Sequence, residues 1–442
     1  MQEKKYGLFT SITMITGIVI GSGIFFKSDD VLTYTNGNMA LGILVFLLAA
    51  VVIIFGSLSI SMLASRSDKP GGMISYAEEF INAKCAGAFG WFQVFLYLAP
   101  LVGVVAWVSG IYLCQLFGIP ATNENTTWIG FIVFCALYLM NILSAALGGF
   151  FQNASMIIKL IPLVIISVAG IVFGKSGTIM QQDVQTFGTA MRQSSLLTAF
   201  APIAFSFDGW IIATSICHKI RNSKRNLPLA LIISPLIILI IYISYFVGVT
   251  SLVGVDKVLE TGNESAFLAA NKIFGTIGAK LILVFVIISV LGTLNGLILA
   301  FIQMPYSLAI RNMIPFSNVL KKQSSKLRGM PVNSAIFGFF LSVIWIYINY
   351  LMQKEKLPGD ASELSICINY LNYIILYFAV IKLTKKKEIK NKFMGYVVPI
   401  IASIGSFLIF TAAFSHPLFW VYVIVSVAVL SGGYFYTKRY SI

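Results

Sequence analysis

Near the N-terminus, a glycine-rich stretch from Thr16 to Phe25 carries Gly17, Gly21 and Gly23 within seven positions. Each glycine inside a helix costs up to about 1 kcal/mol relative to alanine, so the stretch predicts an unwound turn. Such a turn creates a new helix start, whose free N–H groups and dipole attract an anion such as a carboxylate. The alternative is a tight helix contact, with Gly17 and Gly21 on a face of small residues.

A second interruption, Phe205–Trp210, places Asp208 and Gly209 near the middle of another apolar run. A carboxylate in the hydrocarbon core of a membrane is costly and is a functional candidate by default. An unwound helix also exposes carbonyl groups, which suit a cation. Asp208 is therefore a candidate ligand-binding residue. The alternative is a structural hydrogen bond to a neighbouring helix.

Both interruptions lie in segments that we expect to cross a membrane. The chain is 58% hydrophobic and only 11% charged, whereas soluble domains carry roughly 25% charged residues. A spanning helix needs about 20 apolar residues. Twelve runs meet this length, at about 8–35, 39–64, 91–117, 128–147, 154–174, 195–217, 229–254, 279–303, 332–352, 364–383, 395–415 and 417–437. These runs predict an all-α membrane protein in which residues 1–442 form one transmembrane domain.

The lysines and arginines indicate which way the segments run. If the N-terminus is cytoplasmic, most of the 31 lysines and arginines fall in cytoplasmic loops and tails, notably at 219–225, 311–328 and 382–392. An excess of positive charge marks the cytoplasmic side of a membrane protein. We therefore expect both termini in the cytoplasm and the chain in the plasma or inner membrane. The net charge of +15 then reflects topology, and we expect no nucleic-acid partner.

The placement of the two interruptions indicates an internal repeat. They fall in the first and sixth segments, five apart, so the second copy crosses the membrane in the opposite sense. Broken helices at matching positions of two inverted halves are typical of a transporter with its substrate site between the halves. We expect the halves at about 8–174 and 195–383, followed by two further helices at about 395–437.

Five short motifs carry a resemblance to a known family. The stretch Gly17–Phe25 resembles the first-helix signature of the L-type amino-acid transporter (LAT) family of the APC superfamily. Supporting motifs are 70–76, 87–91, 225–228 and 294–296. The resemblance implies an APC/LeuT-like fold with a 5+5 inverted repeat, broken helices 1 and 6, and two extra C-terminal helices. It also implies transport of amino acids, and no enzymatic activity.

The resemblance also implies roles for residues at both interruptions. The backbone amides of Ser22, Gly23 and Ile24 would bind the carboxylate of the substrate. Carbonyl groups around Ile20 and the second interruption would bind its amino group, and Phe205 would cover it. The implied substrate-binding residues are Ile20, Gly21, Ser22, Gly23, Ile24, Phe205, Ser206 and Asp208.

Lys159 lies in the fifth apolar segment and resembles a lysine of the family's fifth helix. In sodium-coupled relatives of this fold, a sodium ion ties helix 1 to helix 8. The ammonium group of Lys159 would take over that electrostatic support of helix 1 without an ion. The alternative is that Lys159 extends to the nearby cytoplasmic surface along its apolar stem.

The sequence departs from the family pattern at three places. His218 and Lys219 replace a pair of acids, and Gln303 replaces an arginine. The loop 117–127 lacks the cysteine by which animal members link a glycoprotein, so we expect no disulfide-linked heavy chain and a bacterial protein that works alone. The two histidines lie in different loops and the cysteines show no ligand spacing, so we expect no metal and no cofactor.

Three functions stay open at this point. The leading hypothesis is a sodium-independent antiporter that exchanges small neutral L-amino acids of the alanine, serine and cysteine class by alternating access. It rests on glycines and apolar residues around the predicted site, with no charged group besides Asp208. The second is a proton-coupled amino-acid importer in which Asp208 or Lys159 titrates. The third is an amino-acid sensor that binds without transport.

Overall fold

The structure is a computed structural model that describes residues 7–440 except 68–71, 145–147, 149–150, 152–153, 156–157, 212–219 and 328. The motif positions 70–71 and the pair His218 and Lys219 therefore lie outside the described residues. Apart from isolated β-bridges, one of which joins Ser324 to Met330, the regular elements of the described ranges are helices. The prediction of an all-α membrane protein is confirmed.

The described helices follow the twelve apolar runs in order. They are α1 (Leu8–Val19), α2 (Gly23–Tyr34), α3 (Met39–Ala64), α4 (Met73–Phe80), α5 (Ala83–Phe92), η1 (Gln93–Leu98), α6 (Ala99–Phe117), α7 (Asn123–Leu143), α9 (Leu160–Phe173), α10 (Ser176–Gln193), α11 (Phe200–Ser206), α13 (Ser223–Val253), α14 (Val255–Thr261), η3 (Gly262–Glu264), α15 (Ser265–Ala309), α16 (Ser317–Leu320), α17 (Val332–Lys354), α18 (Ala361–Lys385), η4 (Phe393–Val397), α19 (Val398–Thr411), η5 (Ala412–Ser415) and α20 (Phe419–Tyr440).

Within the described ranges, nine helices are long and apolar enough to cross a membrane unaided. The three remaining runs are the first, the fifth and the sixth. The first is split into α1 and α2, and the sixth is represented by the short helix α11. In the fifth, α9 is followed by α10 at a bend of 81°. The inverted relation of the two halves stays a prediction.

The helices extend beyond the apolar runs at several ends. The third span begins at Ala83 rather than at residue 91, because the Asn82 side chain caps it by accepting a hydrogen bond from the Cys85 amide at 2.8 Å. In α15, Gly275 has φ +67° and separates residues 265–274 from the spanning part. A hydrophobic pattern reports only the length inside hydrocarbon, whereas caps decide where a helix ends.

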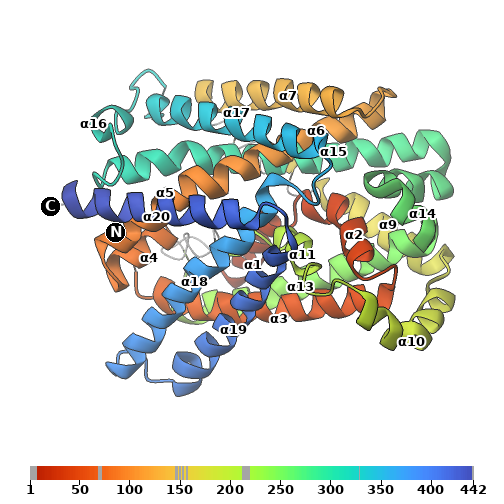
Figure 1. Ribbon diagram of the computed structural model, residues 1–442, viewed down its shortest axis with the longest axis horizontal. Coiled ribbons are helices and arrows are strands. Elements are labelled where there is room, and N and C mark those ends of the chain that lie inside the picture. The colour runs from red at the N-terminus through yellow and green to blue at the C-terminus, as the bar shows by residue number, and fades with distance from the viewer. Residues whose placement is uncertain are drawn as a thin grey trace.

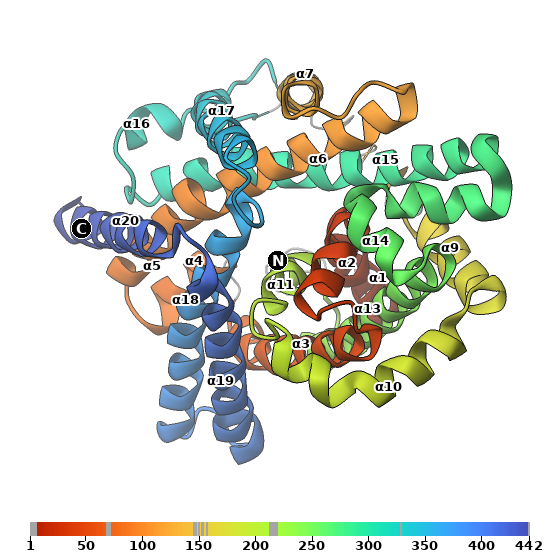
Figure 2. The ribbon, with the colours of Figure 1, turned by 45° about the vertical axis from the view of Figure 1, so that its right-hand side comes forward.

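The broken helices α1, α2 and α11 lie at the centre of the molecule, with α3, α6, α13, α15 and α18 around them (Figures 1 and 2). The elements α10 and α14 lie at one end of the long axis, here termed the α10 face. The helix α16 and the C-terminal end of α20 lie at the opposite end, termed the α16 face (Figure 1). The centre of the bundle is therefore where both interruptions meet.

Candidate functional site

The first interruption is an unwound turn between two short helices. Helix α1 ends at Val19, residues 20–22 are non-helical, and α2 begins at Gly23. The first backbone hydrogen bond of the second half runs from the Phe25 amide to the Ser22 carbonyl at 3.0 Å. The amides at a helix start have no intrahelical partner, so the turn presents N–H donors at the centre of the bundle.

Tyr242 of α13 joins the two interruptions. Its hydroxyl lies 2.8 Å from the Ser206 carbonyl and 3.2 Å from the Val19 carbonyl. A hydroxyl has one proton to donate, so Tyr242 can serve one of these carbonyl groups at a time. The last residues of α1 and α11 are thereby held against one buried side chain.

The glycines of the turn permit close approach to neighbouring helices. A Cβ atom at Gly23 would lie 2.8 Å from the Cα atom of Ser206. One at Gly21 would lie 2.8 Å from the Thr293 hydroxyl oxygen of α15. Both distances are below van der Waals contact, so a side chain at either position requires its neighbour to move. The glycine-rich stretch is thus unwound, as its glycines predict, and it also packs tightly against a neighbouring helix, as the alternative interpretation predicts.

A cavity of about 260 Å³ lies between the interruptions. The predicted site residues that line it are Gly21, Ser22, Gly23, Lys159, Phe205, Ser206 and Asp208. The remaining wall comes mainly from η1, α6 and α15, notably Tyr97, Leu101, Thr293 and Leu297. The side chains of Ile20 and Ile24 are fully buried in the core instead, so they could contribute only their backbone.

Ser22 offers an unused hydroxyl group in this cavity. The residue is 1% exposed, and its side-chain oxygen has no hydrogen-bond partner among the described residues. Buried polar groups are normally hydrogen-bonded. A ligand in the cavity would supply the missing partner, beside the N–H groups of the same turn.

Asp208 has a partner that the sequence did not indicate. The Tyr97 hydroxyl lies 2.7 and 2.6 Å from the two carboxylate oxygens of Asp208. Tyr97 belongs to the π-helix η1 in the third span, an irregularity that is frequent at functional sites. No motif surrounds Tyr97, so only the three-dimensional packing reveals it.

Lys159 reaches the first broken helix. Its side chain is buried, and its ammonium group donates a hydrogen bond to the Gly17 carbonyl of α1. It therefore does not extend to the protein surface. It also lines the cavity, which corrects the expectation that Asp208 is the only charged group near the site.

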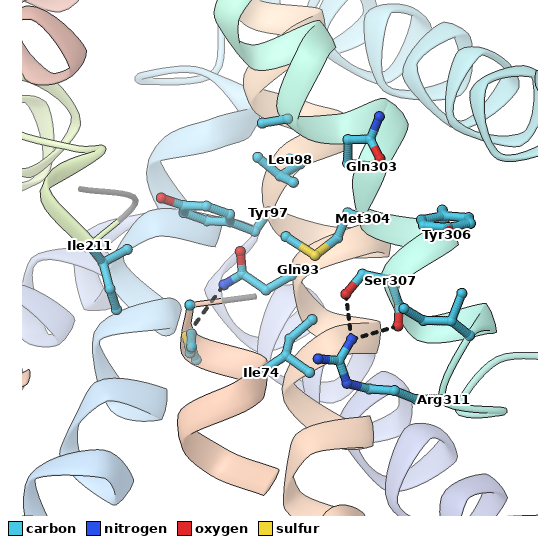
Figure 3. Close-up of a pocket in the computed structure, with 14 residues that line it drawn as sticks. Ile74, Gln93, Tyr97, Leu98, Ile211, Gln303, Met304, Tyr306, Ser307 and Arg311 are labelled. Atoms are coloured by element: carbon cyan, nitrogen blue, oxygen red, sulfur yellow. Dashed lines mark hydrogen bonds between the residues drawn. The ribbon is translucent and has the colours of Figure 1, made fainter. Parts of the chain in front are cut away.

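A second cavity of about 340 Å³ continues from the first towards the α16 face. The two share Tyr97, Leu98 and Ala300. Figure 3 shows Tyr97 and Gln93 on one wall, and Gln303 and Arg311 on the side of α15. Arg311 donates to the Ser307 hydroxyl at 2.8 Å and to Glu78 at 3.2 Å.

On its other side, the cavity is covered by aromatic rings. Phe205 lines the cavity and is 7% exposed. The Phe26 ring of α2 meets it edge to face, with 5.2 Å between the ring centroids. The cavity between the interruptions thus continues towards the α16 face and is covered towards the α10 face.

A polytopic helical bundle with a central cavity between broken helices defines a class of membrane transporter. Comparison with known proteins identifies the family. Residues 6–437 match the amino acid permease family, and the chain belongs to it. The motif-based assignment to an amino-acid transporter rather than an enzyme is thereby confirmed.

Individual relatives match over most of their length. The chain is 29% identical over 413 residues to the serine/threonine exchanger SteT of Bacillus subtilis, covering 92% of this chain and 90% of that protein. It is 26% identical over 455 residues to the human b(0,+)-type amino acid transporter 1, covering 98% and 87%. The yeast high-affinity methionine permease is 25% identical over 390 residues, covering 84% and 65%. These relatives agree with the LAT-type resemblance.

Proposed function

We propose that this transporter is a sodium-independent antiporter of small neutral L-amino acids, of the alanine, serine and cysteine class. The observation that carries the proposal is the cavity between the two interruptions, which pairs N–H donors and the Ser22 hydroxyl with the Asp208 carboxylate. Its volume of about 260 Å³ is below the roughly 300–1,000 Å³ of typical ligand pockets, which favours a small substrate. The relative SteT is itself a serine/threonine exchanger by name.

The zwitterionic backbone of an amino acid matches the polarity of the site. Its carboxylate would accept hydrogen bonds from the amides of Ser22, Gly23 and Ile24 at the start of α2, where the helix dipole favours an anion. Its ammonium group would lie near the carbonyl of Ile20 and the carboxylate of Asp208. In the second interruption, the Ser206 carbonyl already accepts a hydrogen bond from the Tyr242 hydroxyl at 2.8 Å. It is therefore a weaker candidate to bind the ammonium group than the Ile20 carbonyl or the Asp208 carboxylate.

Sodium independence follows from Lys159 in this proposal. The ammonium group bonded to the Gly17 carbonyl would hold α1 in place by charge, as a bound cation would. An ammonium group held there would make a coupling ion unnecessary at this position. The driving force for uptake would then be the outward gradient of another amino acid.

We place the α16 face in the cytoplasm, with both termini, because the basic loops around Lys321 and Lys385 lie there and positive charge favours that side. The larger cavity would then be the cytoplasmic entrance. In alternating access, α1, α2 and α11 would move against a scaffold that includes α6 and α15. We further propose one transmembrane domain of two inverted halves, in a bacterial inner membrane, without a disulfide-linked heavy chain.

Counterflow in proteoliposomes tests this proposal. Vesicles loaded with unlabelled L-alanine should take up labelled L-alanine, L-serine and L-cysteine transiently above equilibrium, with sodium absent and no pH gradient. Labelled L-phenylalanine and L-arginine should enter at least tenfold more slowly. Uptake that needs an imposed proton gradient would instead identify an importer, and binding without uptake would identify a sensor.

A further inference from the structure

A buried lysine lies between three carboxylates on the side of the site that faces α10. The ammonium nitrogen of Lys27 in α2 lies 3.2 Å from Asp30 and 2.8 Å from Asp360, and it also pairs with Glu363. The side chains of Lys27, Asp360 and Glu363 are 3%, 2% and 7% exposed. Lys27, Asp360 and Glu363 are termed the Lys27 cluster.

The Lys27 cluster joins two helices that are far apart in the chain. Lys27 belongs to the second half of the first broken helix. Asp360 is the N-cap of α18 and accepts hydrogen bonds from the Ser362 and Glu363 amides at 2.8 and 3.3 Å. The carboxylates are therefore fixed to the start of α18, so any movement of α2 away from α18 separates them from the lysine.

The same lysine also touches the cover of the substrate cavity. Its nitrogen lies 5.0 Å from the ring centroid of Phe26 and 5.7 Å from that of Phe205. Both distances are within the range of a cation–π contact. Because Phe205 lines the cavity, one continuous series of contacts runs from the substrate cavity through Phe205 and Lys27 to α18.

A third cavity lies beyond this cluster, on the side of the α10 face. It has a volume of about 150 Å³ and is lined by residues including Tyr34, Glu363, Cys367 and His416. It shares no lining residue with the central cavity, whereas the cavity towards the α16 face shares three. The Lys27 cluster therefore lies where the pathway is closed.

The chemistry of the cluster suits a contact that opens and closes. Removing charges from water is expensive, and a buried ion pair often stabilises a fold no better than apolar residues of similar volume. When separated and hydrated, the same groups regain their solvation. A buried ion pair can thus hold two helices together in one state and release them in another at small net cost in free energy.

We propose that Lys27, Asp360 and Glu363 form the gate that closes the α10 side of the transport pathway, and that Phe205 couples this gate to the occupied site. The inference rests on the proposed alternating access. In the open state, α2 leaves α18, water enters between Lys27 and the carboxylates, and the third cavity joins the central one. Lys27 is then a positioning residue of the transport cycle and does not contact the substrate.

The native Cys367 reports directly on this opening. It lies one helical turn after Glu363, is fully buried and lines the third cavity. A variant that keeps Cys367 as its one cysteine is obtained by replacing Cys85, Cys114, Cys135 and Cys217 with serine. The measurement is the rate at which a membrane-impermeant maleimide, added outside intact cells without amino acids, modifies Cys367.

In this background, Lys27→Gln should accelerate modification at least tenfold, while Lys27→Arg should stay within threefold of the parent. The matched control is Lys257→Gln, which breaks the exposed pair with Glu260 at 2.9 Å in α14 and should change nothing. Equal rates for Lys27→Gln and the parent, or equal acceleration by Lys257→Gln, would overturn the gate.

A second variant covers the case in which Lys27→Gln does not fold, as judged by size-exclusion chromatography. Glu363→Gln keeps Lys27 paired with Asp360 and should accelerate modification at least threefold; an unchanged rate overturns the proposal. Because the assay measures access to a thiol and not amino-acid flux, its failure leaves the proposed exchange activity untouched. Conversely, wild-type counterflow tests exchange without reference to the gate.

Discussion

Replacing Gly21 by alanine places one methyl group between the first broken helix and α15. The new Cβ atom would lie 2.8 Å from the hydroxyl oxygen and 3.2 Å from the methyl carbon of Thr293. Ordinary van der Waals contact begins at 3.4 Å, so the turn and α15 must separate by roughly 0.6 Å. Threonine is β-branched and has few alternative rotamers in a helix, so it cannot simply turn away.

This displacement falls on the backbone that we assign to substrate binding. Misplacement by about 1 Å can cost a reaction about a hundredfold in rate, so we expect Gly21→Ala to slow exchange roughly tenfold, or about 1.4 kcal/mol. The protein should remain folded, because overpacking by a methyl group costs only about 1–3 kcal/mol. The assay is the initial rate of L-alanine counterflow at matched protein density in the vesicles.

The structure also specifies the rescue. Truncating Thr293 to alanine removes both clashing atoms and leaves its Cβ atom at 3.6 Å from the new methyl group. The double variant should therefore exchange within threefold of Thr293→Ala alone. The four proteins form a double-mutant cycle, which isolates the contact from any separate effect of Thr293 on the cavity. Wild-type activity in Gly21→Ala, or additive losses in the cycle, would refute this reasoning.

Three further outcomes are expected. In Gly23→Ala, the new Cβ atom would lie 2.8 Å from the Cα atom of Ser206. No side-chain truncation relieves this backbone contact, so the variant should slow counterflow more than Gly21→Ala does. The control is Gly188→Ala, whose Cβ atom would have nothing within 4 Å and which should show wild-type counterflow. Tyr97→Phe removes the hydroxyl donor to the half-buried Asp208 carboxylate. It should lower the free energy of unfolding by about 1.5–3 kcal/mol, measured as a lower Tm in detergent, and an unchanged Tm would contradict this. Burial lowers the pKa of His416 in the folded protein, so on acidification the unfolded chain binds a proton at a higher pH than the folded protein does. Stability should therefore fall as the pH drops below about 6.5. His416→Gln should make Tm depend less on pH between about pH 7 and 5, and an identical profile would contradict this.

Much of the fold follows from the sequence because hydrocarbon imposes simple rules. Twelve apolar runs of spanning length, interrupted by Gly21 and Gly23 in the first and by Asp208 and Gly209 in the sixth, indicate an all-helical bundle with two weak points. Helix ends are harder to predict, because they depend on single hydrogen bonds such as the cap that Asn82 provides to the Cys85 amide.

The candidate site was only partly accessible from the sequence. The residues of the glycine-rich turn can be recognised from the sequence, because several glycines close together disfavour a continuous helix. Tyr97 and Thr293 cannot, since a tyrosine or threonine in an apolar helix is ordinary until packing places it against Asp208 or Gly21. Lys27 likewise gives no local signal of Asp360 and Glu363, which lie more than 300 positions away.

Trans-dependent efflux tests the central claim most directly. Proteoliposomes loaded with labelled L-alanine would be diluted into sodium-free buffer at equal internal and external pH, with or without unlabelled L-alanine outside. An exchanger should release label rapidly only when external amino acid is present, by at least tenfold over buffer alone. Equal release in both buffers, or release that depends on sodium or a pH difference, would contradict obligatory exchange through the cavity between the two broken helices.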